Sequence, residues 1–353
     1  MVKDTISKVE ALNEKAQAKA VLHLNQLTKP QGSLGRLEEL SIQLAGITGD
    51  YQSQFRDKRV VVMAADHGVV EEGVSSFSKE VTKQMVLNFL SGGAAINVIA
   101  RQAGAKVTCV DVGVESDLSD LQGLVHKKVA FGTKNMAQES AMTKEEVVAA
   151  LENGIEVAEM EIADGANLLA TGEMGIGNTT ASSAVLAALC SVSVDQVVGR
   201  GTGITNTALT NKIHVIEQAL NLHQPHSDDA IDVLQKVGGL EICALAGLII
   251  GSASRKVPII IDGFISTVAA LCAYRLCPEV RSYLIPSHLS EEPGHFIALN
   301  ELELEPMLKM NMRLGEGSGA ALMFPLIDTA QQIMREMATF EKAGVSSRKD
   351  GLE

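Results

Sequence analysis

The stretch Arg59-Val60-Val61-Val62-Met63-Ala64-Ala65, followed at once by Asp66-His67-Gly68, decides the fold class. An apolar run of this length is typical of a strand that is covered on both faces, as the strands of a parallel sheet are. A long helical pattern over residues 79–103 comes next. Because such strands and helical patterns alternate, the sequence predicts an α/β fold with a mainly parallel sheet and helices on both faces. The further strands are expected at residues 106–110, 167–170, 257–261 and 283–285.

The two ends of the chain follow a different pattern. Residues 4–27 and 326–342 read as helices without strands among them. We expect these helices to pack together as a small helical domain that comprises residues 1–30 and 326–353. The large α/β catalytic domain then comprises residues 31–325.

Composition narrows the class of partner. The chain of 353 residues is 46% hydrophobic and carries 30 Lys and Arg against 43 Asp and Glu, a net charge of −13, with no basic run. Nucleic acid and anionic membranes are therefore not expected as partners. The first residues lack the apolar core of a signal peptide, and the longest apolar stretch, 242–251, is too short to span a bilayer, so a cytoplasmic protein is expected. The five cysteines lie in apolar runs without a CxxC pair, which favours buried reduced thiols over a metal site.

Polar residues and glycines close every predicted strand. In an open parallel sheet the ligand crevice lies outside the carboxyl ends of the strands, so these residues are expected to line one cleft. The closing residues are Asp66-His67-Gly68, Asp111, Gly172-Glu173, Asp262-Gly263 and Pro286-Ser287-His288.

Two glycine-rich clusters each hold one carboxylate. Glu173 lies in the segment 172–180 and Glu316 in the segment 313–319. Glycines leave the neighbouring carboxylate open to substrate, and an apolar, glycine-lined pocket raises the pKa of a carboxyl group toward the range useful for proton transfer. The two clusters predict one active site assembled from distant segments.

The turn Gly175 to Thr180 is open to two interpretations. Its glycines expose backbone N–H groups, Thr179 and Thr180 add hydroxyls, and the helix that follows presents its positive end, which together favour a phosphate cradle. Alternatively, Asn178 or Thr179 caps that helix and no ligand is involved. The turn has neither the spacing of a P-loop nor the order GxGxxG.

A second glycine-rich turn, residues 199–203, is a weak signal by itself. Lys212 follows it on an expected helix. This lysine either reaches the phosphate or is solvated.

The sequence resembles the nicotinate-nucleotide–dimethylbenzimidazole phosphoribosyltransferase family over about residues 29–344. The segments that carry the resemblance occur in the family's order and approximate spacing: Lys29-Pro30-Gln31-Gly32-Ser33-Leu34-Gly35-Arg36-Leu37-Glu38, Ala65-Asp66-His67-Gly68-Val69, residues 172–180, Val237-Gly238-Gly239, Ile261-Asp262-Gly263-Phe264, residues 283–288 and Arg313 to Gly319. The resemblance implies a Rossmann-like sheet, a small domain from both chain ends and a homodimer. It also implies transfer of the 5-phosphoribosyl group from nicotinate mononucleotide to 5,6-dimethylbenzimidazole, which gives α-ribazole 5′-phosphate and nicotinate for the cobalamin nucleotide loop.

The resemblance assigns roles to particular residues. Glu316 matches the general base that takes the proton lost by the attacking benzimidazole, and Glu173 matches a second active-site carboxylate. The residues implied around the phosphate, ribose and nicotinate are Gly175, Gly177, Asn178, Thr179, Gly201, Gly203, Lys212, Ser290, Arg313 and Leu314, with Asp262 and Gly263 nearby. The departing pyridinium leaves as a neutral ring, so the chemistry calls for no cofactor and no metal.

One departure from the family concerns the acceptor base. Benzimidazole-using members carry serine and glutamine where this sequence has Phe77 and Met85. We therefore hypothesise a more apolar acceptor pocket that takes a wider range of aromatic bases, including purines or phenolics. The alternative is that the two side chains simply pack a pocket of unchanged preference.

Two other motifs favour structural roles. For Asp66-His67, a hydrogen-bonded histidine at a strand end is preferred over a metal site. Ser227-Asp228-Asp229 resembles a magnesium-binding acidic pair, but helix capping explains it better. The rival functions, an NAD-dependent oxidoreductase and a non-catalytic nucleotide sensor, lack support, because no GxGxxG turn with an acidic ribose ligand is found and both Glu173 and Glu316 are present.

Overall fold

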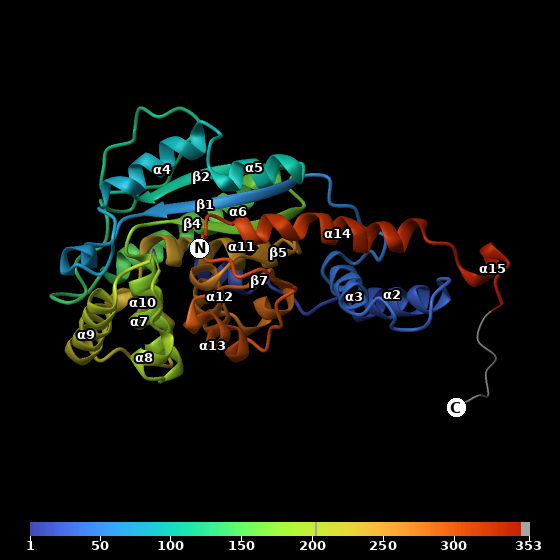
Figure 1. The fold of residues 1–353 in the computed structure, drawn as a ribbon. Coiled ribbons are helices and arrows are strands. Elements are labelled where there is room, and N and C mark those ends of the chain that lie inside the picture. Colours follow the sequence, from blue (N-terminus) through green and yellow to red (C-terminus); the bar gives the residue numbers. More distant parts are fainter. Residues whose placement is uncertain (202, 347–353) are drawn as a thin grey trace.

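A six-stranded parallel sheet forms the centre of the protein, as the computed structural model in Figure 1 shows. The structure describes residues 1–201 and 203–346. The strand order is β3-β2-β1-β4-β5-β6, with every neighbouring pair parallel. The strands are β1 (Lys58–Ala65), β2 (Ala105–Gly113), β3 (Val125–His126), β4 (Leu168–Met174), β5 (Ile259–Ile261) and β6 (Leu284–Pro286), and a separate pair joins β7 (His288–Leu289) to β8 (Leu308–Lys309). The predicted α/β fold with a mainly parallel sheet is confirmed.

Helices cover both faces of the sheet because strand β1 is apolar on both sides. Val61, Met63 and Ala65 belong to one buried cluster, which includes α6 and α11, whereas Val60, Val62 and Ala64 face the cluster that includes α14. The main covering helices are α4 (Glu80–Leu90), α5 (Ala95–Gln102), α6 (Lys144–Ala163), α7 (Asn178–Cys190), α10 (Ala230–Val237), α11 (Leu240–Ser254), α12 (Phe264–Leu276) and α14 (Ser318–Glu336).

The remaining elements surround this core. They are α1 (Val2–Ile6), α2 (Glu14–Gln26), α3 (Arg36–Thr48), α8 (Val194–Val197), α9 (Asn206–His223), α13 (Pro293–Glu301) and α15 (Phe340–Ala343), with 3-10 helices at Gly68–Glu72 and Pro278–Tyr283. None of the helices within 1–201 and 203–346 is both long and apolar enough to cross a membrane.

Several predicted boundaries were wrong. The pattern over residues 79–103 is two helices, α4 and α5, because the chain turns through Gly92 with a φ of 74°. Residues 4–27 likewise divide into α1 and α2. Strand β4 continues to Met174, so Glu173 lies within the strand and not in the loop after it. The short edge strand β3 was missed.

The helices from the two ends of the chain do contact each other. Ala20 and Leu24 of α2 share a buried cluster with Met334 of α14, and α3 adds Ala45. The ring of His23 is 2.8 Å from the carbonyl oxygen of Met334. In contrast, α1 packs against α6 and α11 of the α/β core. The division at residues 30 and 326 stays a prediction, and residues 347–353 of the expected small domain lie outside the described residues.

The predicted thiols form no disulfide in the described structure. Cys109, Cys243, Cys272 and Cys277 are buried, whereas Cys190 is only half-buried.

Candidate active site

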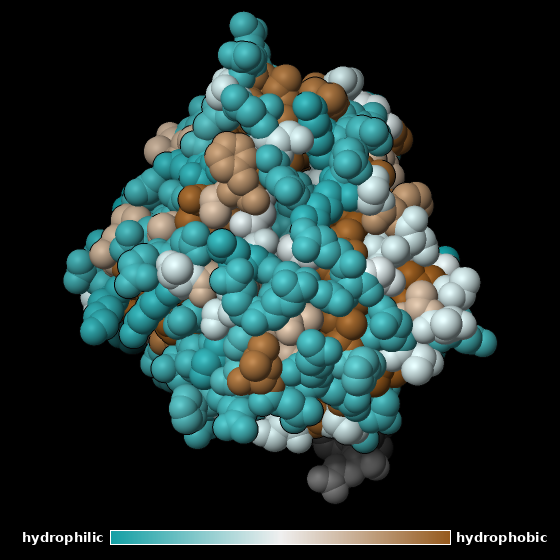
Figure 2. Space-filling view, turned by 90° about the vertical axis from the view of Figure 1, so that its left-hand side faces the viewer, coloured by the Kyte–Doolittle hydropathy of each residue, from teal (hydrophilic) through white to brown (hydrophobic). Residues whose placement is uncertain are grey.

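A cavity of about 400 Å³ opens at the carboxyl ends of the central strands, a size typical of small-molecule sites. Figure 2 looks onto the end of the molecule toward which β1 points in Figure 1, where hydrophilic residues cover most of the surface and apolar residues appear in small separate patches. The cavity brings together the predicted residues Phe77, Met85, Glu173, Gly175, Gly177, Asn178, Thr179, Gly201, Lys212, Asp262, Gly263, Ser290, Arg313, Leu314 and Glu316. Gly203 is exposed and does not line it, and Thr202 of the same turn lies outside the described residues.

Glu173 is the penultimate residue of β4 and is buried. The side-chain amide of Asn178 and the backbone N–H of Glu316 donate hydrogen bonds to its carboxylate. Burial, together with the negative charges of Asp262 and Glu241, nevertheless raises the pKa of Glu173 to about 8. Before substrate binds, this carboxyl group is therefore largely protonated at neutral pH.

Glu316 lies in a strained turn before α14. Its φ is 64°, between Gly315 (φ 86°) and Gly317 (φ 89°), a left-handed conformation that costs free energy for any residue other than glycine. A Cβ atom at Gly315 would collide with the carboxylate of Glu173, so the turn also needs glycine to approach β4. Such strain at a non-glycine residue is common at functional sites.

The side chain of Glu316 points toward the N-terminus of α5. The backbone N–H of Ile96 donates to its Oε2 over 3.3 Å. Burial raises the pKa of Glu316, the Ile96 hydrogen bond opposes that rise, and the charge of Asp262 adds to it. Ile96 N–H thus fixes Oε2 of Glu316, and Glu316 also lines the cavity.

Asp262 fastens the turn that carries Glu316. Its Oδ1 accepts a hydrogen bond from Ala320 N–H at 2.9 Å, and its Oδ2 accepts one from Gly317 N–H at 3.3 Å. The helix α14 has no capping side chain of its own, because Gly317 occupies the N-cap position. Asp262 therefore supplies the cap from the end of β5 and positions Glu316.

The glycine turn connects β4 to α7 as predicted. Its N-cap is Gly177, with a φ of 97° and no side-chain cap, so the alternative in which Asn178 or Thr179 caps the helix is wrong. The hydroxyl of Thr179 instead accepts a hydrogen bond from Lys212. Thr180 is fully buried and does not line the cavity, which corrects its predicted part in the cradle.

Lys212 is buried, with a relative exposure of 1%, so it is not a solvated lysine. Its Nζ donates to Thr179 Oγ1 over 2.9 Å and to the carbonyl oxygen of Gly199 over 3.4 Å. Burial lowers the pKa of Lys212 to about 8, and the charge of Glu292 opposes that shift. The N-terminus of α7, Lys212 and the turn at Gly201 together present hydrogen-bond donors to one end of the cavity, which suits a phosphate.

Part of the cavity lining is apolar. Val74, Val81 and Ile176 line it beside Phe77 and Met85. The side chain of Phe77 is half exposed. This lining suits a flat aromatic ring.

Among the cavity residues that sequence reasoning missed, two are charged, Arg200 and Glu292. Glu292 precedes Pro293, the first residue of α13. A proline at a helix start is visible in the sequence, but nothing local indicates that the preceding glutamate turns into the cavity.

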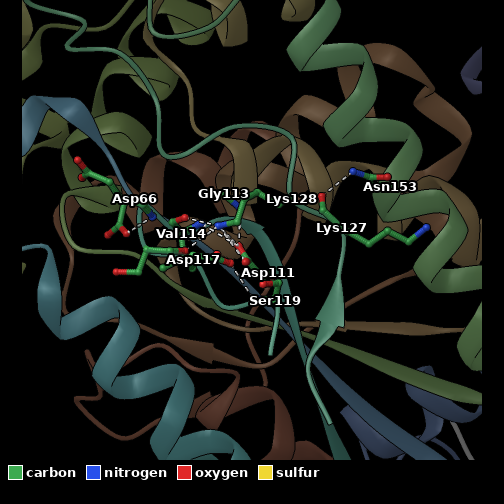
Figure 3. Close-up of polar contacts among 11 residues, drawn as sticks. Asp66, Asp111, Gly113, Val114, Asp117, Ser119, Lys127, Lys128 and Asn153 are labelled. Atoms are coloured by element: carbon green, nitrogen blue, oxygen red, sulfur yellow. Dashed lines mark hydrogen bonds and ion pairs between the residues drawn. The ribbon is translucent and has the colours of Figure 1, made fainter. Parts of the chain in front are cut away.

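The expectation of one cleft for all strand-closing residues was wrong in part. Glu173, Asp262, Gly263 and His288 line the cavity, and the residues that do not are Asp66, His67, Gly68, Asp111, Gly172, Pro286 and Ser287. Figure 3 shows that Asp66 and Asp111 hold the loop after β2. Asp111 Oδ1 accepts from Val114 N–H at 2.9 Å, and its Oδ2 pairs with Lys128 at 2.9 Å. Asp66 accepts from Glu115 N–H at 2.8 Å.

The two motifs assigned structural roles behave accordingly. His67 Nε2 lies 2.7 Å from Glu241 Oε1, and both side chains are buried, which confirms a hydrogen-bonded histidine. Asp229 caps α10 by accepting from the backbone N–H groups of Ile231 and Asp232. Within the described ranges, no group of three or more His, Cys, Asp or Glu is placed to hold a metal ion.

Comparisons with known proteins identify the family of the chain. A family model described as a phosphoribosyltransferase matches residues 9–345, so the chain belongs to this class of enzyme. Over 345 residues the chain is 54% identical to the nicotinate-nucleotide–dimethylbenzimidazole phosphoribosyltransferase of Halalkalibacterium halodurans, with 98% of this chain and 96% of the relative covered. The same enzyme of Chloroflexus aurantiacus is 53% identical, with 99% of both chains covered.

A solved structure extends the similarity to three dimensions. The crystal structure of CobT from Thermus thermophilus superposes with a TM-score of 0.91 at 47% identity and covers 94% of this chain and 99% of that one. The chain therefore belongs to the nicotinate-nucleotide–dimethylbenzimidazole phosphoribosyltransferase family.

Proposed function

We propose that this enzyme transfers the 5-phosphoribosyl group from nicotinate mononucleotide to 5,6-dimethylbenzimidazole or a related aromatic base. The products are α-ribazole 5′-phosphate and nicotinate, for the nucleotide loop of cobalamin. The observation that carries the proposal is that one cavity is lined by hydrogen-bond donors at Lys212 and Gly201, by two buried carboxylates and by apolar side chains. The names of the relatives point to the same reaction.

The donor occupies the end of the cavity beside α7. Its 5′-phosphate accepts hydrogen bonds from the turn before α7 and pairs with Lys212, whose ammonium is already held next to Thr179. A cationic pyridinium and the positive charge that develops on the ribose favour the ionised form of Glu173. The raised pKa of Glu173 thus keeps it neutral before the donor binds and lets it become a counter-charge afterwards.

The acceptor occupies the apolar end, beside Phe77 and Met85. One ring nitrogen attacks the ribose carbon while the other nitrogen gives up its proton. Glu316 takes that proton. Because Ile96 N–H holds Oε2, Oε1 is the oxygen that accepts the proton. General-base catalysis of this kind contributes roughly 10²–10⁴-fold to the rate.

An assay of nicotinate release from nicotinate mononucleotide, with and without dimethylbenzimidazole, tests this function. Release that depends on the base, together with formation of α-ribazole 5′-phosphate, is the expected result. Release that is equally fast without any base indicates a hydrolase and contradicts the proposal.

The identity of the acceptor is a separate part of the proposal. Phe77 and Met85 replace hydrogen-bonding side chains with apolar ones, so we propose that adenine or phenol is used as well as dimethylbenzimidazole. Turnover of these three bases under the same conditions decides the matter. Activity with dimethylbenzimidazole alone supports a pocket of unchanged preference.

The remaining proposals concern assembly and location. We propose a homodimer, as the family resemblance implies, in which residues 1–30 and 326–353 form the small domain, and a cytoplasmic enzyme. The shared cluster of Ala20, Leu24 and Met334 supports the small domain. Analytical ultracentrifugation measures the oligomeric state, and a monomer at micromolar concentration contradicts the dimer.

A further inference from the structure

Glu292 places a carboxylate inside the donor-rich end of the cavity. It immediately precedes α13, its relative exposure is 8%, and it lines the cavity together with Gly201, Ser290 and Lys212. Neither the proposed catalysis nor the proposed phosphate cradle uses this residue.

The turn at residues 199–201 is shaped around this carboxylate. Oε1 of Glu292 accepts a hydrogen bond from the backbone N–H of Gly201 over 2.9 Å. A Cβ atom at Gly199 would collide with Oε2, so the backbone can approach the carboxylate only at glycine. Among the described residues, 1–201 and 203–346, Oε2 has no hydrogen-bond partner.

The charge of Glu292 also acts on the cation of the cradle. Lys212 lies close enough for the carboxylate to stabilise its ammonium against the cost of burial. A group that accepts a hydrogen bond from a backbone N–H in a glycine turn and stabilises a nearby ammonium by its charge resembles a phosphate oxygen in such a cradle.

We infer that Glu292 is a built-in anion that occupies part of the phosphate subsite before the donor binds and must leave Gly201 when it does. The inference rests on the proposed function, in which this end of the cavity holds the 5′-phosphate. Until then the carboxylate accepts a hydrogen bond from Gly201 N–H, and its charge stabilises the buried ammonium of Lys212 without an ion-pair contact. A phosphate that enters meets a like charge, so Glu292 weakens phosphate binding and releases Gly201 N–H only to an anion that binds it better.

The variant Glu292→Gln tests this inference. Glutamine keeps the shape and can still accept from Gly201 N–H, but it removes the negative charge. Isothermal titration at pH 7 with inorganic phosphate, and separately with nicotinate mononucleotide, is expected to show binding at least about fivefold tighter than in the wild type, because like charges in a partly buried site repel. Glu291→Gln is the matched control, because it removes the same charge from an exposed neighbouring residue and is expected to change binding little.

Phosphate binding that is not tightened by Glu292→Gln is the result that contradicts the inference. If Glu292 is only a clamp for the turn, Glu292→Gln binds phosphate equally well or more weakly, and the inference is overturned. The melting temperature of Glu292→Gln shows whether the variant folds; if it does not fold, the wild-type measurement described next decides the inference.

A second measurement needs no variant. In a crystal structure of the wild-type protein soaked with inorganic phosphate, a phosphate oxygen is expected at Gly201 N–H and the carboxylate of Glu292 away from it. Phosphate bound beside Lys212 with Glu292 still on Gly201 overturns the inference but leaves the phosphate cradle intact. In contrast, if the variant Lys212→Ala binds phosphate as tightly as the wild type, the phosphate cradle itself is contradicted.

Discussion

Replacing Glu316 by glutamine is expected to abolish most of the turnover and to leave donor binding nearly unchanged. The structure makes glutamine a close substitute in shape. Its carbonyl oxygen can accept the hydrogen bond from Ile96 N–H that now goes to Oε2, and its NH₂ group then faces the cavity, where it cannot take a proton. Glutamine also accepts the left-handed φ of 64° about as well as glutamate does.

The magnitude follows from the role of a general base. Loss of a factor of roughly 10²–10⁴ in kcat corresponds to about 3–5 kcal/mol of transition-state stabilisation. Folding is expected to survive, because glutamine removes the cost of burying a charge, the same cost that raises the pKa of Glu316. The residual rate reflects the positioning of donor and acceptor in the cavity.

The assay must measure kcat at saturating donor and acceptor, so that weaker binding is not mistaken for slower chemistry. A base works in its deprotonated form, so wild-type kcat is expected to rise with pH through the raised pKa of Glu316, and Glu316→Gln is expected to lose that dependence. Glu316→Asp keeps the carboxylate but shortens the reach, and an intermediate rate is expected. A near-normal kcat in Glu316→Gln removes Glu316 from the role of base and makes Glu173 the next candidate.

Three further changes test other parts of the structure. Lys212→Ala is expected to raise the KM for nicotinate mononucleotide at least about tenfold with little change for nicotinate riboside; equal turnover of both donors by the wild type contradicts the cradle. Glu173 has a folded-state pKa of about 8, above its ordinary value of 4.5, so its contribution to stability is complete below pH 4.5 and is lost as the pH rises toward 8. Glu173→Gln is therefore expected to raise the melting temperature more at pH 9 than at pH 5, and an equal effect at both pH values refutes this. Arg59 lies at the end of β1 opposite to the cavity and pairs with buried Glu161 at 3.0 Å. Arg59→Ala is expected to lower the free energy of unfolding in urea by about 3–5 kcal/mol and to leave kcat unchanged. A decrease below about 1 kcal/mol argues against a stabilising buried pair.

The sheet could be predicted because its central strands carry their signal locally. Residues 59–65 and 106–110 are short apolar runs closed by polar residues, and both lie within observed strands. The break between α4 and α5 was missed because residues 79–103 keep a helical pattern across Ser91-Gly92-Gly93. Strand β3 was missed because two residues at a sheet edge carry too little pattern to detect.

The site was predictable where glycine restricts the backbone. The turns that contain Gly177 and Gly315 adopt positive φ values and bring the chain against a neighbouring strand or side chain, and clusters of glycine show this in the sequence. The unpredicted roles belong to Asp262 and Glu292. Each acts on a segment far away in the sequence, on Ala320 and Gly201 respectively, so no local pattern reveals them.

The acidic residues of the cavity act on one another, and this explains why their roles depend on the fold. Asp262 holds the turn of Glu316 through Gly317 and Ala320, and its charge contributes to the raised pKa of both Glu316 and Glu173. The backbone of Glu316 in turn donates to Glu173. A substitution at Asp262 therefore changes the position of the base and the pKa of both carboxyl groups at once, whereas Glu316→Gln removes only the base. A loss of activity in an Asp262 variant consequently cannot by itself assign Asp262 to substrate binding, and the comparison with Glu316→Gln is what separates positioning from chemistry.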